Sequence, residues 1–212
     1  MAIISAGGND FTLPKGLLCY QSTFFDKPFN GKFKEAKEQK LTLTDCSSET
    51  FQFVVQWIFS TQVVLPSHHR TNSLPNSNAE GISKLLAFLK VADEINLLGP
   101  FDQVIETMRS ALKLSRASLQ SSHITTAFEI PSAHNARKLF IQACIKDYSI
   151  ELHQKSTLKA SPFRFQNLLE KSAAFAAALL KEVRVAFQSR IFDRGQTTFL
   201  DPLLSERFST VN

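Results

Sequence analysis

The side chains that most often carry out covalent chemistry are sparse and widely spaced in this sequence. The three cysteines, Cys19, Cys46 and Cys144, form no Cys-x-x-Cys pair. A catalytic cysteine needs a nearby histidine or other cationic site that holds its thiolate, whereas these three lie inside or beside apolar patterns. We interpret them as buried structural thiols of a protein from a reducing compartment.

The histidines and carboxylates show no catalytic or metal-binding spacing either. His123, His134 and His153 are too far apart to share one helical turn, and no cysteine pair completes them as zinc ligands. Asp93 and Glu94 are adjacent and point to different faces of a helix, which argues against shared acid–base work. The motifs of serine hydrolases, zinc proteases and phosphate-binding loops are missing from the sequence. The sequence therefore predicts no enzymatic activity, no cofactor and no metal ion.

The remaining candidate is a contact surface rather than a reaction centre. Phe33 and Glu35 lie in the charged tract from Asn30 to Lys40, just ahead of the most apolar segment of the chain. An exposed aromatic ring can anchor in a partner's pocket while a carboxylate fixes the register of the contact. The alternative is that Phe33 folds back onto the core and that Glu35 is solvated among lysines. The residues themselves leave both interpretations open.

The elements that position the Asn30–Lys40 tract lie in the amino-terminal half, where strand and helix patterns alternate. The clearest helix spans residues 47–59, because Asp45, Ser47 or Ser48 can cap its start. Within it Phe51, Val54, Val55 and Ile58 recur at helical spacing. Residues 66–80, rich in Pro, Ser and Asn, predict a mobile loop. The other predicted elements are a hairpin at 3–13, a short helix near 17–25, strands at 41–43 and 61–65, and helices at 82–98 and 101–112.

The carboxy-terminal half is predicted to be helical. Helices at 123–128, at 133–148 and from Pro162 to about Arg190 would form an extension over residues 116–191. The tail, residues 192–212, has no clear period, so we expect it to be loosely ordered.

The net charge of +5 lies entirely in the second half: residues 101–212 carry fifteen Lys or Arg and ten Asp or Glu, against nine of each in residues 1–100. These cations are scattered, which favours a solvated helical surface over a nucleic-acid site. The amino terminus has no basic leader, and the longest uncharged helical run, Ser172–Leu180, has nine residues where a membrane span needs about 20. We expect an intracellular protein, cytoplasmic or nuclear, that does not enter membranes.

Several motifs of the first hundred residues resemble the BTB/POZ domain, in the form common in fungi. The Phe33-Lys34-Glu35-Ala36 tract, the strand around Leu41 and the helix "FQFVVQWIFST" follow one another in the family's order, and Ala92-Asp93 matches a later helix. The resemblance implies an α/β (α+β) fold, with a small sheet flanked by a helical cluster in residues 1–115 and an all-helical extension after it. The family's F-x-V-H-K-x-x-L-x-x-x-S-x-x-F pattern is matched at Phe11, Leu13, Lys15, Leu18, Ser22 and Phe25.

The same resemblance implies a protein-interaction module. In family members that recruit cullin-type ubiquitin-ligase scaffolds, a hydrophobic-x-Glu motif follows the early helices, and Phe33-x-Glu35 matches it here. This suggests a substrate adaptor whose contact residues are Phe33, Glu35 and Phe59, the last of which replaces a tyrosine of the family. The alternative function is a transcription or chromatin cofactor that uses the basic second half and binds DNA in a salt-dependent way.

Two departures from the family pattern bear on these expectations. Pro14 stands where the family has histidine before Lys15, which removes an imidazole and a backbone donor. The chain also begins almost at its first predicted strand, so we do not expect a dimer formed by exchange of an amino-terminal segment. A homodimer formed in another way is left open.

Overall fold

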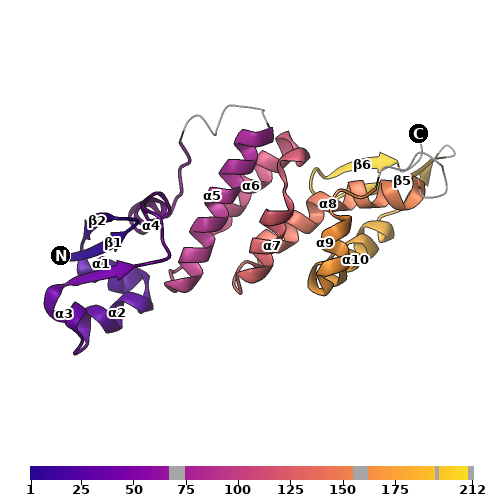
Figure 1. Ribbon diagram of the computed structural model, residues 1–212. Coiled ribbons are helices and arrows are strands. Elements are labelled where there is room, and N and C mark those ends of the chain that lie inside the picture. Colours follow the sequence, from indigo (N-terminus) through magenta and orange to yellow (C-terminus); the bar gives the residue numbers. More distant parts are fainter. Residues whose placement is uncertain (67–74, 155–161, 194–195, 210–212) are drawn as a thin grey trace. The chain divides into compact units, whose positions relative to one another are not determined.

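Figure 1 shows the computed structural model, which describes residues 1–66, 75–154, 162–193 and 196–209. The chain divides into two compact units. The first unit contains Met1–Asn72, Glu80–Met108 and Ile130–Ser132, and the second contains Ser73–Ala79, Arg109–Glu129 and Ala133–Asn212. The domain limits at residues 115 and 191 stay predictions.

A three-stranded mixed sheet lies in the first unit. Strands β1 (Ala2–Ala6) and β2 (Asn9–Leu13) form the predicted hairpin, and Gly7 and Gly8 take the positive φ values, 54° and 81°, that its turn requires. Strand β3 (Lys40–Leu43) runs parallel to β1, which gives the order β2-β1-β3. Alternate side chains of β1 are buried in the core.

Helix α4 (Ser48–Ser60) contacts this sheet through its Phe51 ring, whose centroid lies 4.9 Å from that of Phe11 on β2. Its Phe51, Val54 and Ile58 are buried, as their spacing predicts, and the Ser47 side chain caps it by accepting a hydrogen bond from the Thr50 N–H at 3.1 Å. A small sheet with a helical cluster confirms the predicted α+β class. The other helices up to residue 114 are α1 (Lys15–Gln21), α2 (Thr23–Asn30), α3 (Lys34–Glu38), α5 (Pro75–Glu94) and α6 (Asp102–Leu114).

The second unit is mainly helical and ends in a small sheet. Helix α10 (Ala173–Gln188) buries Phe175, Leu179 and Val183 and makes its main contacts with α8 (His134–Gln154). Its other elements are the 3-10 turn η2 (Arg116–Ser118), helices α7 (Ser121–Glu129) and α9 (Gln166–Lys171), and the antiparallel strands β4 (Ile191–Asp193), β5 (Gln196–Asp201) and β6 (Glu206–Ser209).

The sequence prediction was wrong between residues 61 and 80 in two respects. Residues 61–65 form no strand, because side chains rather than a neighbouring strand bind their backbone: Gln103 bonds both the N–H and the C=O of Val63, and Gln56 accepts from the N–H of Val64. Helix α5 begins at Pro75, so residues 75–80 of the predicted loop are helical, with proline at the helix start where it is tolerated. The rest of that loop, residues 67–74, lies outside the described residues.

Two predictions about the carboxy-terminal part were also wrong. The helix expected from Pro162 to Arg190 is interrupted at Ser172, which ends α9 and caps α10. The tail predicted to be loosely ordered forms strands β4, β5 and β6, because Phe199 and Phe208 bury their rings against each other and Asp201 pairs with Arg116. Residues 194–195 and 210–212 of that tail lie outside the described part.

Candidate protein-docking groove

A groove of about 690 Å³ opens on the first unit beside helices α2 and α3. Its walls are partly apolar, and two of the three predicted contact residues, Phe33 and Glu35, line it. We call this feature the docking groove. Its described lining residues are Thr23, Phe24, Lys27, Pro28, Phe33, Glu35, Leu41 and Asn96.

Helix α2 supplies one wall because it has two apolar faces. Phe25 and Phe29, four residues apart, are fully buried in the core. Phe24, Lys27 and Pro28 recur at helical spacing on another face and line the groove. The sequence analysis missed this second face, although the pattern Phe24-Phe25-Asp26-Lys27-Pro28-Phe29 already contains both sets of spacings.

Phe33 lies at the mouth of the groove with 62% of its surface exposed. Helix α2 ends at Gly31, whose N–H donates to the Lys27 carbonyl at 2.9 Å, and Phe33 is the N-cap residue of α3. A methyl group on Gly31 would lie 2.4 Å from that carbonyl oxygen and 3.2 Å from Cδ2 of Phe33. The missing side chain at Gly31 therefore lets the Phe33 ring lie close to the end of α2, and the ring does not fold back into the core.

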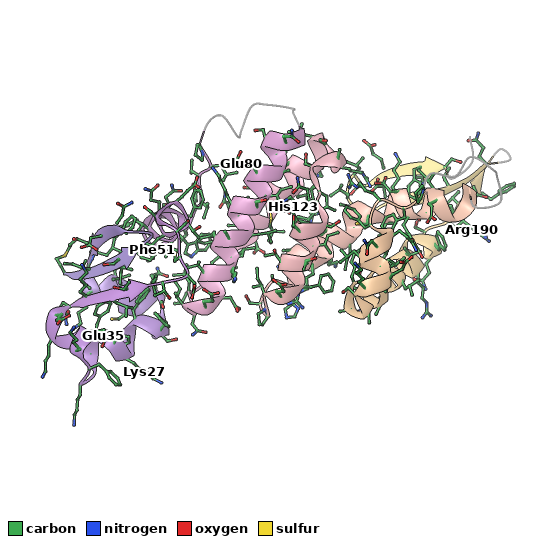
Figure 2. The ribbon with its side chains drawn as sticks, viewed as in Figure 1. Lys27, Glu35, Phe51, Glu80, His123 and Arg190 are labelled. Atoms are coloured by element: carbon green, nitrogen blue, oxygen red, sulfur yellow. The ribbon has the colours of Figure 1, made fainter. Side chains whose placement is uncertain are left out.

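Glu35 lies in the first turn of α3, where the helix dipole favours a carboxylate. It is partly exposed, and within the described ranges it has no ion-pair partner. The neighbouring Lys34 pairs instead with Glu38 at 3.4 Å, one turn further along the helix. Lys27 and Glu35, labelled in Figure 2, thus bring one positive and one negative side chain from α2 and α3 to the same groove.

Side-chain hydrogen bonds fix the backbone that carries these residues. Lys15 Nζ donates to the Phe29 carbonyl at 2.8 Å and so ties α1 to the end of α2. Gln39, in the left-handed conformation with φ of 50°, ends α3 and donates to the Ala36 carbonyl at 2.5 Å. Pro14, which replaces the family's histidine, is the residue before the first turn of α1, so its missing N–H costs no hydrogen bond within the helix.

Phe59, the third predicted contact residue, does not line the docking groove. It lies near the end of α4, followed by Ser60 and the left-handed Thr61, and 59% of its surface is exposed. The structure therefore brings Phe33 and Glu35 together in one groove and leaves Phe59 as a separate exposed ring.

A model of the BTB/POZ domain matches residues 2–93. Residues 2–93 are therefore similar to a BTB/POZ domain. The match contains all of the groove's lining residues except Asn96. The chain has no match among curated proteins.

The three cysteines, all among the described residues, are not activated as nucleophiles. Burial raises the pKa of Cys46 to about 11, and burial also raises the pKa values of Cys19 and Cys144, so these thiols are not held as thiolates. Over the part of the chain that the structure describes, no three His, Cys, Asp or Glu side chains are grouped as metal ligands. None of the described helices is both long and apolar enough to span a bilayer.

Proposed function

We propose that this chain is a substrate adaptor of a cullin-type ubiquitin ligase, and that it docks on the scaffold through Phe33 and Glu35. BTB/POZ domains are protein-interaction modules, and residues 2–93 match that family. The observation that carries the finer assignment is that the hydrophobic-x-Glu motif lines one groove, with the aromatic ring exposed and the carboxylate without an ion-pair partner among the described residues.

The groove offers two kinds of contact to a partner. The exposed ring of Phe33 inserts into an apolar pocket of the scaffold, while Phe24 and Leu41, both partly exposed, receive an apolar side chain in return. Glu35 accepts a hydrogen bond from a cation or backbone N–H of the partner, which fixes the register. In this proposal the second unit binds the client protein, the chain is of the fungal type, and it works in the cytoplasm or nucleus.

The test is calorimetric titration of the purified chain with the amino-terminal domain of a fungal cullin. The wild type is compared with Phe33→Ala and Glu35→Lys. We expect each variant to bind at least about tenfold more weakly, because each removes a central contact of about 1.4 kcal/mol or more. Circular dichroism confirms that each variant is folded.

Matched controls lie outside the groove. Tyr20→Ala removes an aromatic ring that is 74% exposed, and Glu38→Lys makes the same charge change on the same helix as Glu35→Lys. Both should bind like the wild type, whereas Phe59→Ala reports whether the contact extends to the end of α4. A folded wild-type chain that does not bind the cullin domain rules out the adaptor role.

A further inference from the structure

Helix α10 of the second unit has a second face that the described residues leave exposed. Phe175, Leu179 and Val183 are buried, whereas Leu180, Arg184 and Phe187 follow one another at spacings of four and three residues on the exposed side. Leu180 is 57% exposed and Phe187 40%. We define the α10 face as Leu180, Lys181, Arg184 and Phe187.

The end of α10 is held rigidly against the small sheet. The Phe187 and Phe199 rings lie with their centroids 5.0 Å apart, and Phe199 packs in turn on Phe208 at 5.9 Å. Ser189 Oγ, just after the helix, accepts a hydrogen bond from the Leu200 N–H at 2.8 Å. The exposed part of Phe187 is therefore a preformed surface, which lowers the entropy cost of binding to it.

Cations outnumber acids along α10 and in the residues just after it. Residues 173–192 contain Lys181, Arg184 and Arg190 but only one acid, Glu182, which is partly buried. Arg190 lies between α10 and β4 and is labelled in Figure 2. Across the described ranges none of these three cations has an ion-pair partner. The adjoining β6 adds Arg207, which donates to the Ser189 carbonyl at 3.1 Å, and one exposed acid, Glu206.

We propose that the α10 face binds an acidic amphipathic helix of another protein. Leu180 and Phe187 provide apolar anchors two turns apart, which suits leucine-type residues on one stripe of a helix. Lys181, Arg184 and Arg190 complement Glu or Asp residues that flank this stripe. A second copy of this chain fits less well, because two α10 faces in contact would bring like charges together. The proposal concerns the second unit and does not depend on cullin binding by the first unit.

The probe is a fluorescein-labelled helical peptide of about 20 residues, with leucines on one stripe and glutamates on both flanks. Its anisotropy is followed as the full-length chain is added. We expect saturable binding that weakens with added salt. Arg184→Glu and Leu180→Ser should each weaken binding about tenfold or more, which corresponds to about 1.4 kcal/mol. Lys90→Glu, the same kind of charge change on α5, should leave the affinity unchanged.

Two further probes separate the alternatives. The same peptide with lysine in place of glutamate should not bind, and vesicles of phosphatidylserine and phosphatidylcholine should not bind the chain. Binding of the vesicles but not of the acidic peptide would overturn the proposal in favour of a lipid surface. Failure of the acidic peptide to bind, or binding that neither Arg184→Glu nor Leu180→Ser weakens, would also overturn it.

Discussion

His123 on α7, labelled in Figure 2, is a buried titratable residue whose neutral form the fold requires. Its Nδ1 accepts a hydrogen bond from the Gln120 N–H at 3.2 Å, and the ring also bonds the backbone of Ala79. Burial lowers the pKa of His123 to about 4, and the bond to Ala79 opposes this shift only in part. A proton on Nδ1 of His123 would point at the Gln120 N–H, so two hydrogen-bond donors would face each other.

We therefore predict a loss of stability in mild acid that depends on this residue. The pKa of His123 is lower in the folded chain than its ordinary value of 6.5, so the unfolded chain takes up the proton first as the pH falls. The stabilisation is fully present above pH 6.5 and is lost progressively from there towards pH 4.

Urea unfolding of the wild type and of His123→Gln at pH 7 and at about pH 5 measures this effect. Glutamine can accept and donate the same hydrogen bonds but does not titrate. The wild type should lose about 1–2 kcal/mol more than the variant between the two pH values. Equal losses in both proteins would show that His123 does not control the acid response.

The Ser172 side chain decides whether the segment around it forms one helix or the two helices α9 and α10. Its N–H donates to the Leu168 carbonyl at the end of α9, and its Oγ accepts from the Phe175 N–H at 3.2 Å at the start of α10. We predict that Ser172→Ala destabilises the chain by about 1 kcal/mol through loss of the cap, and that Ser172→Asp restores most of this. In a continuous helix alanine would instead be stabilising, since it has the higher helix propensity. Thermal unfolding monitored by circular dichroism distinguishes the two signs.

Elements whose signals are local could be predicted from the sequence. The helix cap from Asp45, Ser47 or Ser48, the apolar spacing from Phe51 to Ile58 and the glycine turn of the first hairpin each act within a few residues. The structure confirms the spacing and the turn, and it shows that Ser47 is the cap. Phe33 and Glu35 were singled out from a short motif, and the structure shows that both line one groove; their role as contact residues stays a prediction.

Elements that depend on distant partners could not be predicted in this way. Residues 61–65 have strand-like composition, but Gln103, some forty positions later, takes up their hydrogen bonds. Strand β5 depends on Arg116 and Phe187, which no local period reveals. The β3 wall of the docking groove was missed for the same reason, because Leu41 lies on a strand that is positioned by parallel pairing with β1. The α2 wall was missed although its spacing is local.

At the scale of the whole molecule, each unit has its own distinguishing feature: the first contains the tryptophan, and the second contains a buried ion pair. The only tryptophan, Trp57, belongs to the first unit, where its Nε1 donates to the Leu98 carbonyl at 2.9 Å and its ring packs on Phe101 at 4.8 Å. The second unit contains a buried ion pair between Arg116 and Asp201. Asp201 is 1% exposed and also accepts from the Leu203 N–H at 2.9 Å.

These features allow a test of whether the units unfold independently. Asp201→Asn keeps the shape of the side chain but leaves Arg116 without its charge partner, which should cost about 3 kcal/mol in the second unit. We predict that the urea midpoint from far-ultraviolet circular dichroism falls and that the curve becomes biphasic, because this signal reports on helices of both units. The midpoint from Trp57 fluorescence should stay at its wild-type value. Fluorescence and dichroism that shift together would instead mean that the chain unfolds as one cooperative body.

A reciprocal variant in the first unit completes this argument. Ser22 is fully buried, and its Oγ donates to the Ile95 carbonyl, so Ser22→Ala leaves a buried acceptor unpaired beside the helices of the first unit. The Trp57 fluorescence midpoint should then fall, while the transition lowered by Asp201→Asn should keep its wild-type position. Since the docking groove and the α10 face lie in different units, independent unfolding would also mean that each can be disabled by mutation without loss of the other.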